Sequence, residues 1–141
     1  MIIYTGNYKL CLSELLLKKG YSVNSQYTES CKDVWIPSAI LKNTIIDRPG
    51  ALQSERCQYE LGIQFCSIPG IKVFTHSEMF LNGVRIGVKR ELISHKDVEI
   101  IYYPESGDCL NVYIKPNGGI EHWPVGFFDV MDESFRELFG I

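Results

Sequence analysis

The stretch NTIIDRPG at residues 43–50 and the stretch IKVFTHSE at residues 71–78 decide the fold that this sequence predicts. In each, a short apolar run of the kind that forms a buried strand, at 43–47 and at 71–74, ends in polar residues. Between them, residues 53–67 place apolar side chains on one stripe of a helix. A strand, a helix and a strand of these lengths form a βαβ unit, whose strands are parallel and joined by a right-handed crossover. The sequence therefore predicts an α/β fold with a parallel βαβ core.

A second helix is expected directly after this unit. It begins at Thr75 or Ser77, either of which can cap its N-terminus, and it ends at about Leu92. Gly83 and Gly87 lie one turn apart in this helix, and each costs roughly 1 kcal/mol there relative to alanine. Two interpretations stay open: another element packs closely against these glycines, or the helix merely tolerates them.

The remaining segments follow different patterns. Residues 97–115 alternate with a period of two around a turn cluster at 105–108, which predicts an antiparallel hairpin. A short C-terminal helix is expected at about 132–139. Near the N-terminus, residues 9–19 have helical spacing, and residues 20–34 are polar and predict a long loop.

The composition is that of one globular domain. The chain has 141 residues, of which 45% are hydrophobic and 22% charged, so it is long enough to bury a core. Its formal net charge of −3 does not indicate a nucleic-acid partner. No apolar run approaches the roughly 18 residues of a membrane span, and the N-terminus lacks the pattern of a signal peptide.

The cysteines and histidines indicate neither a disulfide framework nor a metal site. The five cysteines are odd in number and none has C-x-x-C spacing. We therefore expect free thiols in a reducing cytoplasm. His76, His95 and His122 do not have the spacing of metal ligands, so we expect no metal.

Several short motifs in a fixed order carry a resemblance to a known family: Ile45–Pro49, Thr75–Glu78, Asn82, Val84, Val88, Lys89, Tyr102 and Trp123–Asp129. Through them, the chain from about Asn43 to its end resembles the C-terminal part of ATP-binding-cassette-type ATPases of the overcoming-lysogenisation-defect class. The resemblance implies a single domain in two parts: a variable N-terminal cap at 1–42, and an ATPase C-terminal-half-like part at 43–141. It also suggests a bacterial defence or mobile-element setting.

The resemblance assigns roles to four residues that would be remnants of a nucleotide site. Asp47 matches the acid that holds magnesium, usually through water. Arg48 stands where the family orients or activates the attacking water, but a guanidinium accepts no proton. His76 matches the switch histidine, which contacts the γ-phosphate or orients the water, and Ser77 follows it in the matched Thr-His-Ser motif. Gly50 replaces the family's later glutamate.

The sequence contains no motif for a phosphate-binding loop. Such a loop needs G-x-x-x-x-G-K-[ST], and neither Gly6 nor Gly20 is followed by it. Phosphoryl transfer depends on positioning and electrostatics from all of these parts. We therefore expect no catalytic residue, no autonomous ATP hydrolysis and no resident cofactor, with ATP and magnesium bound only if a partner chain completes the site.

The aromatic segment near the C-terminus is the remaining candidate for function. Trp123, Phe127 and Phe128 are interpreted either as a docking surface for a partner or as cover for the core. Our main hypothesis is a non-catalytic ATPase remnant that serves as an interaction or regulatory subunit, with an ATPase or a second copy as partner. The alternatives are a small inhibitory, immunity-type protein, a nucleotide half-site completed by another chain, and an enzyme with a relocated site.

Overall fold

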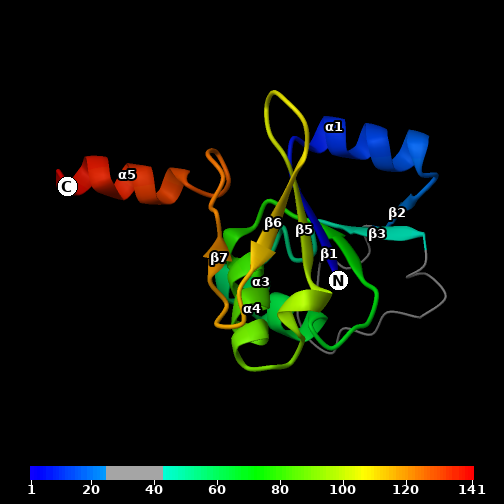
Figure 1. The fold of residues 1–141 in the computed structure, drawn as a ribbon, viewed down its shortest axis with the longest axis horizontal. Helices are drawn as coiled ribbons and strands as arrows, with labels where there is room; N and C mark the ends of the chain where they lie inside the picture. Colours follow the sequence, from blue (N-terminus) through cyan, green and yellow to red (C-terminus); the bar gives the residue numbers. More distant parts are fainter. Residues whose placement is uncertain (25–42) are drawn as a thin grey trace.

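The computed structural model describes residues 1–24 and 43–141, and these residues form a seven-stranded sheet with helices on both faces (Figure 1). The strand order is β2-β3-β4-β1-β5-β6-β7. Their bounds are β1 (Ile2–Gly6), β2 (Ser22–Asn24), β3 (Thr44–Asp47), β4 (Lys72–Phe74), β5 (Glu99–Tyr103), β6 (Leu110–Ile114) and β7 (Ile120–Glu121). The loop expected at 20–34 is corrected at its start, where Ser22–Asn24 form β2, and residues 25–34 lie outside the described residues.

The predicted βαβ unit and the predicted hairpin are both confirmed. Strands β3 and β4 are parallel neighbours, with Ile46 opposite Val73. Helix α3 (Glu55–Phe65) connects them. Strands β5 and β6 pair antiparallel, with Ile100 opposite Val112. The structure is thus a mixed α/β fold whose first five strands in spatial order are parallel.

Strand β1 corrects the expectation of an N-terminal cap. It lies between β4 and β5 in the middle of the sheet and pairs parallel with both. Its residues Ile3 and Tyr4 are almost fully buried, one on each face. Residues 2–6 are therefore an integral strand of the sheet and not a cover over it.

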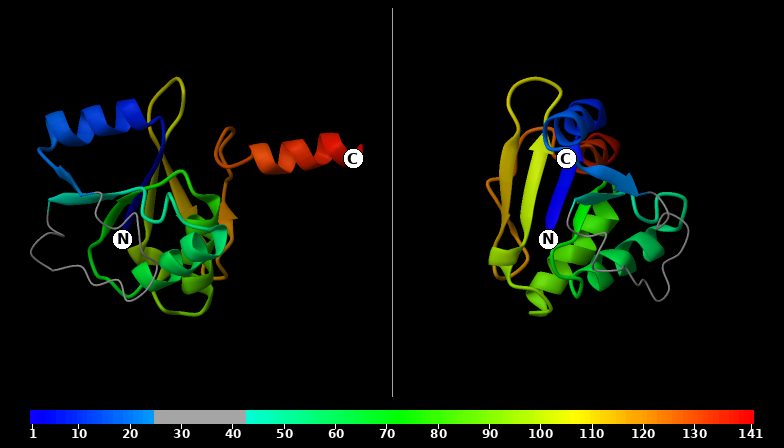
Figure 2. Two further views of the ribbon diagram at one scale, coloured as in Figure 1. Left: turned by 180° about the vertical axis from the view of Figure 1, so that it is seen from behind. Right: turned by 90° about the vertical axis from the view of Figure 1, so that its right-hand side faces the viewer.

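The helices form the two outer layers (Figure 2). Helix α3 and helix α4 (Glu78–Lys89) cover one face, where Leu61, Phe65 and Phe80 join the larger apolar core. On the other face, helix α1 (Tyr8–Leu12) continues as the π-helix η1 (Ser13–Lys18), and Cys11 and Leu15 join the smaller core. Alternate residues of the central strands point into the two cores, as the pleat of a sheet requires.

Glycines bring α3 and α4 into close contact. A Cβ atom added at Gly83 would lie 2.1 Å from the Tyr59 carbonyl oxygen, and one added at Gly62 would lie 2.1 Å from the Phe80 carbonyl oxygen. A Cβ at Gly87 would lie 2.4 Å from the Cys66 sulfur. Of the two interpretations of Gly83 and Gly87, the structure thus supports close packing.

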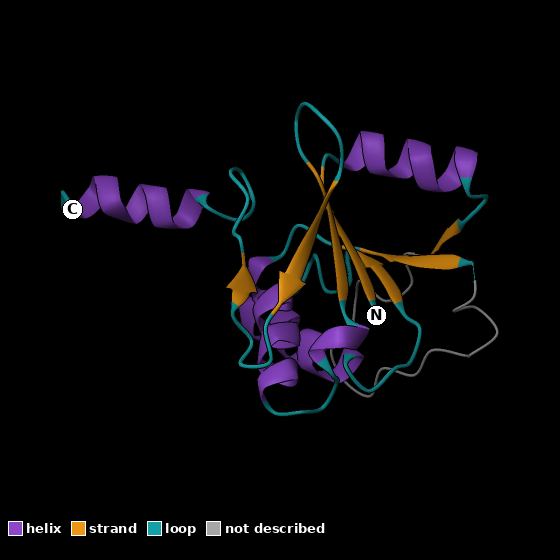
Figure 3. Ribbon diagram, viewed as in Figure 1, coloured by secondary structure: helices purple, strands orange, loops and turns teal. Residues whose placement is uncertain are grey.

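Helix α5 (Val130–Phe139) differs from the other helices because it extends away from the sheet (Figure 3). It begins two residues before the predicted start, and none of its residues is buried. Among the described residues, no helix is both long and apolar enough to cross a membrane.

Candidate functional site

The predicted site residues meet where three parallel strands end. Asp47 is the last residue of β3, His76 follows β4, and Gly6 ends β1. Strand β4 pairs with both β1 and β3, so the carboxyl ends of all three lie at one edge of the sheet. This edge is where open parallel sheets place their ligands.

The Asp47 carboxylate is almost fully buried, and protein groups already bind both of its oxygens. Arg48 donates from Nε to Oδ1 at 3.1 Å and from Nη2 to Oδ2 at 3.0 Å. Tyr8, at the start of α1, donates its hydroxyl to Oδ2 at 3.2 Å. This arrangement is a forked ion pair supported by a third hydrogen bond.

Arg48 is held in this position by several contacts. Its guanidinium lies over the Tyr8 ring, 4.6 Å from the ring centre. The hydrogen bond with Asp47 raises the pKa of Arg48, so its charge is permanent. Burial, followed by the negative charge of Asp47, raises the pKa of the Tyr8 hydroxyl, which therefore stays protonated as a donor. The backbone of Arg48 has φ of 45°, a left-handed conformation that is uncommon for a residue with a side chain.

His76 lies beside this cluster but binds the backbone. Its Nε2 lies 2.7 Å from the Gly6 carbonyl oxygen, to which it donates in the tautomer that carries the proton there. Its ring also packs edge-on against Phe74. The histidine thus links the end of β4 to the end of β1.

Ser77 has a structural role at the start of α4. Its hydroxyl oxygen accepts the Phe80 N–H at 3.0 Å, which caps the helix, and its hydroxyl proton is donated to the Gln58 side chain. The expected cap at Ser77 is therefore confirmed. Thr75 accepts the Ser77 N–H at 2.9 Å and fixes the turn between β4 and α4.

A hollow of about 210 Å³ lies at this edge. Its lining includes Arg48, His76 and Ser77 but not Asp47, whose carboxylate is bound by Arg48. Within residues 1–24 and 43–141, no group of three or more His, Cys, Asp or Glu side chains is placed to hold a metal ion. The structure thus brings the four predicted residues together. The positive charge beside the Asp47 carboxylate is the guanidinium of Arg48.

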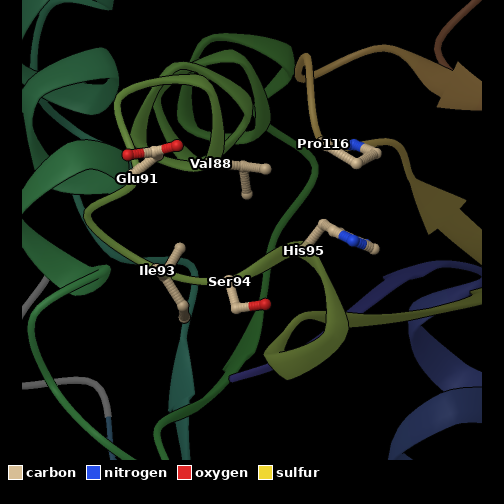
Figure 4. A pocket seen from close by; sticks show the side chains of 6 residues that line it. All are labelled: Val88, Glu91, Ile93, Ser94, His95 and Pro116. Atoms are coloured by element: carbon tan, nitrogen blue, oxygen red, sulfur yellow. The ribbon is translucent and has the colours of Figure 1, made fainter.

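A second hollow, of about 300 Å³, contains a serine, a histidine and a glutamate (Figure 4). Glu91 follows the C-terminal end of α4, Ser94 caps the 3-10 helix η3 (His95–Asp97), and His95 is the first residue of η3. Figure 4 shows the Glu91 and His95 side chains pointing away from each other. These three residues therefore do not form a nucleophile–base–acid array.

The aromatic segment divides into a buried and an exposed part. Phe127 is only 1% exposed and packs edge-on against Tyr102, so its assignment to a docking surface is corrected: it belongs to the core. Trp123 donates its ring N–H to the Phe127 carbonyl and is partly exposed. Trp123 and Phe128 line a hollow of about 470 Å³ at the base of α5, together with Met131 and Phe135, and three carboxylates complete its lining: Glu78, Asp129 and Asp132.

Sequence reasoning missed two features of the candidate sites: the contact of Tyr8 with Asp47 and the exposed apolar side chains of α5. Tyr8 is separated from Asp47 by 39 positions, and only the central placement of β1 brings the two together. The apolar side chains of α5 were not singled out, although Met131, Phe135 and Leu138 follow helical spacing, which was a readable signal.

One family model matches part of the chain. Residues 93–138 match the family described as "Protein of unknown function (DUF3696)". That family is associated, in general, with ATPase-like proteins. The match covers about a third of the chain, from η3 through the hairpin and β7 into α5, and it does not include Asp47 or His76. No curated protein and no solved structure gives a significant match.

Proposed function

We propose that this chain is a non-catalytic, ATPase-like subunit that works by contacting another protein. The observation that carries the proposal is the Asp47 carboxylate, both of whose oxygens are bound by Arg48 and Tyr8. The finer assignment, a degenerate member of the overcoming-lysogenisation-defect class in a bacterial defence or mobile-element setting, is part of the same proposal.

Magnesium does not fit this arrangement. The ion requires oxygen ligands in octahedral geometry and is bound through carboxylates and water. Here a permanent positive charge lies 3.0 Å from Asp47 Oδ2, so a divalent cation would have to displace Arg48. Arg48 also accepts no proton and cannot activate a water molecule.

The phosphate-binding elements are also lacking in the given residues. None of the 12 glycines in the sequence is followed by lysine, so no Walker-type loop is present. At the start of α1, the side chain of Asn7 accepts the Leu10 N–H, so this backbone donor is bound within the chain. His76, the remaining candidate for γ-phosphate contact, binds Gly6.

The exposed apolar surface supports a role in protein contact. Trp123, Phe128, Met131 and Phe135 line the hollow at the base of α5 together with three carboxylates, and further apolar side chains of α5 are exposed. Large exposed apolar patches on globular proteins mark interaction sites.

Calorimetry of the purified chain with ATP and magnesium tests this proposal. We expect no binding heat at millimolar ATP, and phosphate release equal to a blank and unchanged by His76→Ala. The double variant Arg48→Asn with Tyr8→Phe frees Asp47 and serves as the matched control, since it should gain affinity for manganese without gaining hydrolysis. Micromolar ATP affinity of the wild type, or phosphate release that His76→Ala abolishes, would show that the site is functional.

A further inference from the structure

Helix α5 presents its apolar side chains to solvent. Leu138 is 75% exposed, and Met131 and Phe135 are each about half exposed. Figures 1 and 2 show the helix extending from the body, with none of the other helices and strands of residues 1–24 and 43–141 alongside it. Because isolated helices shorter than about 12 residues are marginal in water, a partner that covers the apolar face of this ten-residue helix would stabilise it.

The α1–η1 helix, which covers the face of the sheet opposite to α3 and α4, has a second exposed apolar face. Its inner side chains, Cys11 and Leu15, are fully buried against the sheet. On the outer side, Leu10, Leu16 and Leu17 are exposed. The segment Tyr8–Lys18 has 11 residues and α5 has ten, so each is about 15 Å long. The two helices therefore match in length.

The two helices also carry opposite charge. Helix α5 has three acidic residues, Asp132, Glu133 and Glu137, against a single base. That base, Arg136, already pairs with Asp132 at 2.9 Å. The α1–η1 helix and its C-cap residue Lys19 instead have an excess of basic residues, with Lys9, Lys18 and Lys19 against Glu14. An acidic apolar helix and a basic apolar helix are complementary in both respects.

The two helices cannot meet within one chain. They lie at opposite ends of the long axis, on the same side of the molecule (Figure 1). A two-fold axis between two copies places each α5 beside the α1–η1 helix of the other, and such a contact closes on itself. We propose that the partner of this surface is a second copy of the chain, in a dimer in which each α5 packs on α1–η1 of the other. This inference rests on the proposed function, a subunit that contacts another protein, and identifies that protein as a second copy of the chain.

Sedimentation of the purified chain over a range of concentrations tests this dimer. We expect a monomer–dimer equilibrium for the wild type. Leu138→Asp should raise the dimer dissociation constant about a hundredfold, because the two-fold dimer buries Leu138 of both copies and the substitution replaces each with a charged side chain. Leu52→Asp is the matched control, since Leu52 is 82% exposed and lies outside both helices, and it should leave the dimer unchanged. Circular dichroism verifies that each variant is folded.

A charge exchange identifies the contacted helix. Glu133→Lys with Glu137→Lys should weaken the dimer, and adding Lys9→Glu with Lys18→Glu in the same chain should restore it. A wild-type monomer at all concentrations, assemblies that grow beyond two copies, or a charge exchange that restores nothing would each overturn the inference. Failure of the proposed function appears separately, as nucleotide binding in calorimetry.

Discussion

Helices α4 and α5 share an amphipathic pattern but have very different surroundings. Both are amphipathic, with acidic residues in the first turn and a basic residue in the last. Six residues of α4 are buried against α3 and the sheet, whereas α5 has no buried residue. An amphipathic pattern therefore identifies the face that is stabilised by burial, but it does not show whether the same chain supplies the cover.

The largest expected difference between these helices is in stability. Phe80→Ala on α4 removes a fully buried ring that packs against Phe65, and it should lower the free energy of unfolding by about 3–5 kcal/mol. The matched change Phe135→Ala on α5 should cost below about 0.5 kcal/mol in the dilute monomer, because that ring is 48% exposed. Denaturant titration measures both, and equal losses would contradict the comparison.

The next largest expected effect is on the reactivity of the Cys66 thiol, which α4 covers. Burial raises the pKa of Cys66 to about 11, whereas Cys109 is exposed. The thiolate is the reactive form, so at pH 8 the raised pKa alone lowers the reactivity of Cys66 about a hundredfold, and the rate rises as the pH approaches 11. Iodoacetamide labelling mapped by mass spectrometry should modify Cys109 first. Comparable rates at the two cysteines would mean that α4 does not cover Cys66.

A smaller loss is expected where α4 crosses α3. Gly83→Ala would place a Cβ atom 2.1 Å from the Tyr59 carbonyl oxygen, so the two helices must separate, at a cost of about 2 kcal/mol. Gly119→Ala is the control, because the neighbours of its new Cβ are the ends of the Lys115 and Asn117 side chains, which can move. Thermal unfolding compares the two variants, and an unchanged midpoint for Gly83→Ala would exclude the close crossing.

Local patterns in the sequence predicted much of the fold. The apolar runs ending in Asp47 and before Thr75 each form a buried parallel strand, and the change to a period of two after residue 97 marks the hairpin. These features depend on neighbours in sequence, which is why they are readable without a structure.

The features that sequence reasoning missed depend on contacts between distant residues. Strand β1 is a single short apolar run, and its central position follows from pairing with β4 and β5, 70 or more positions away. The same pairing carries Tyr8 to Asp47 and Gly6 to His76. Phe127 and Phe128 are adjacent in sequence, yet only Phe127 is fully buried, because an irregular segment has no period from which to assign faces.

Hydrogen–deuterium exchange at two protein concentrations tests the central claim, that the apolar face of α5 is reserved for another molecule. The amides of α4 should be protected equally at both concentrations, because this chain alone covers them. The amides of α5 should exchange rapidly in the dilute monomer and become protected when the second copy binds. Strong protection of α5 in the dilute monomer, or rapid exchange at every concentration, would contradict the account.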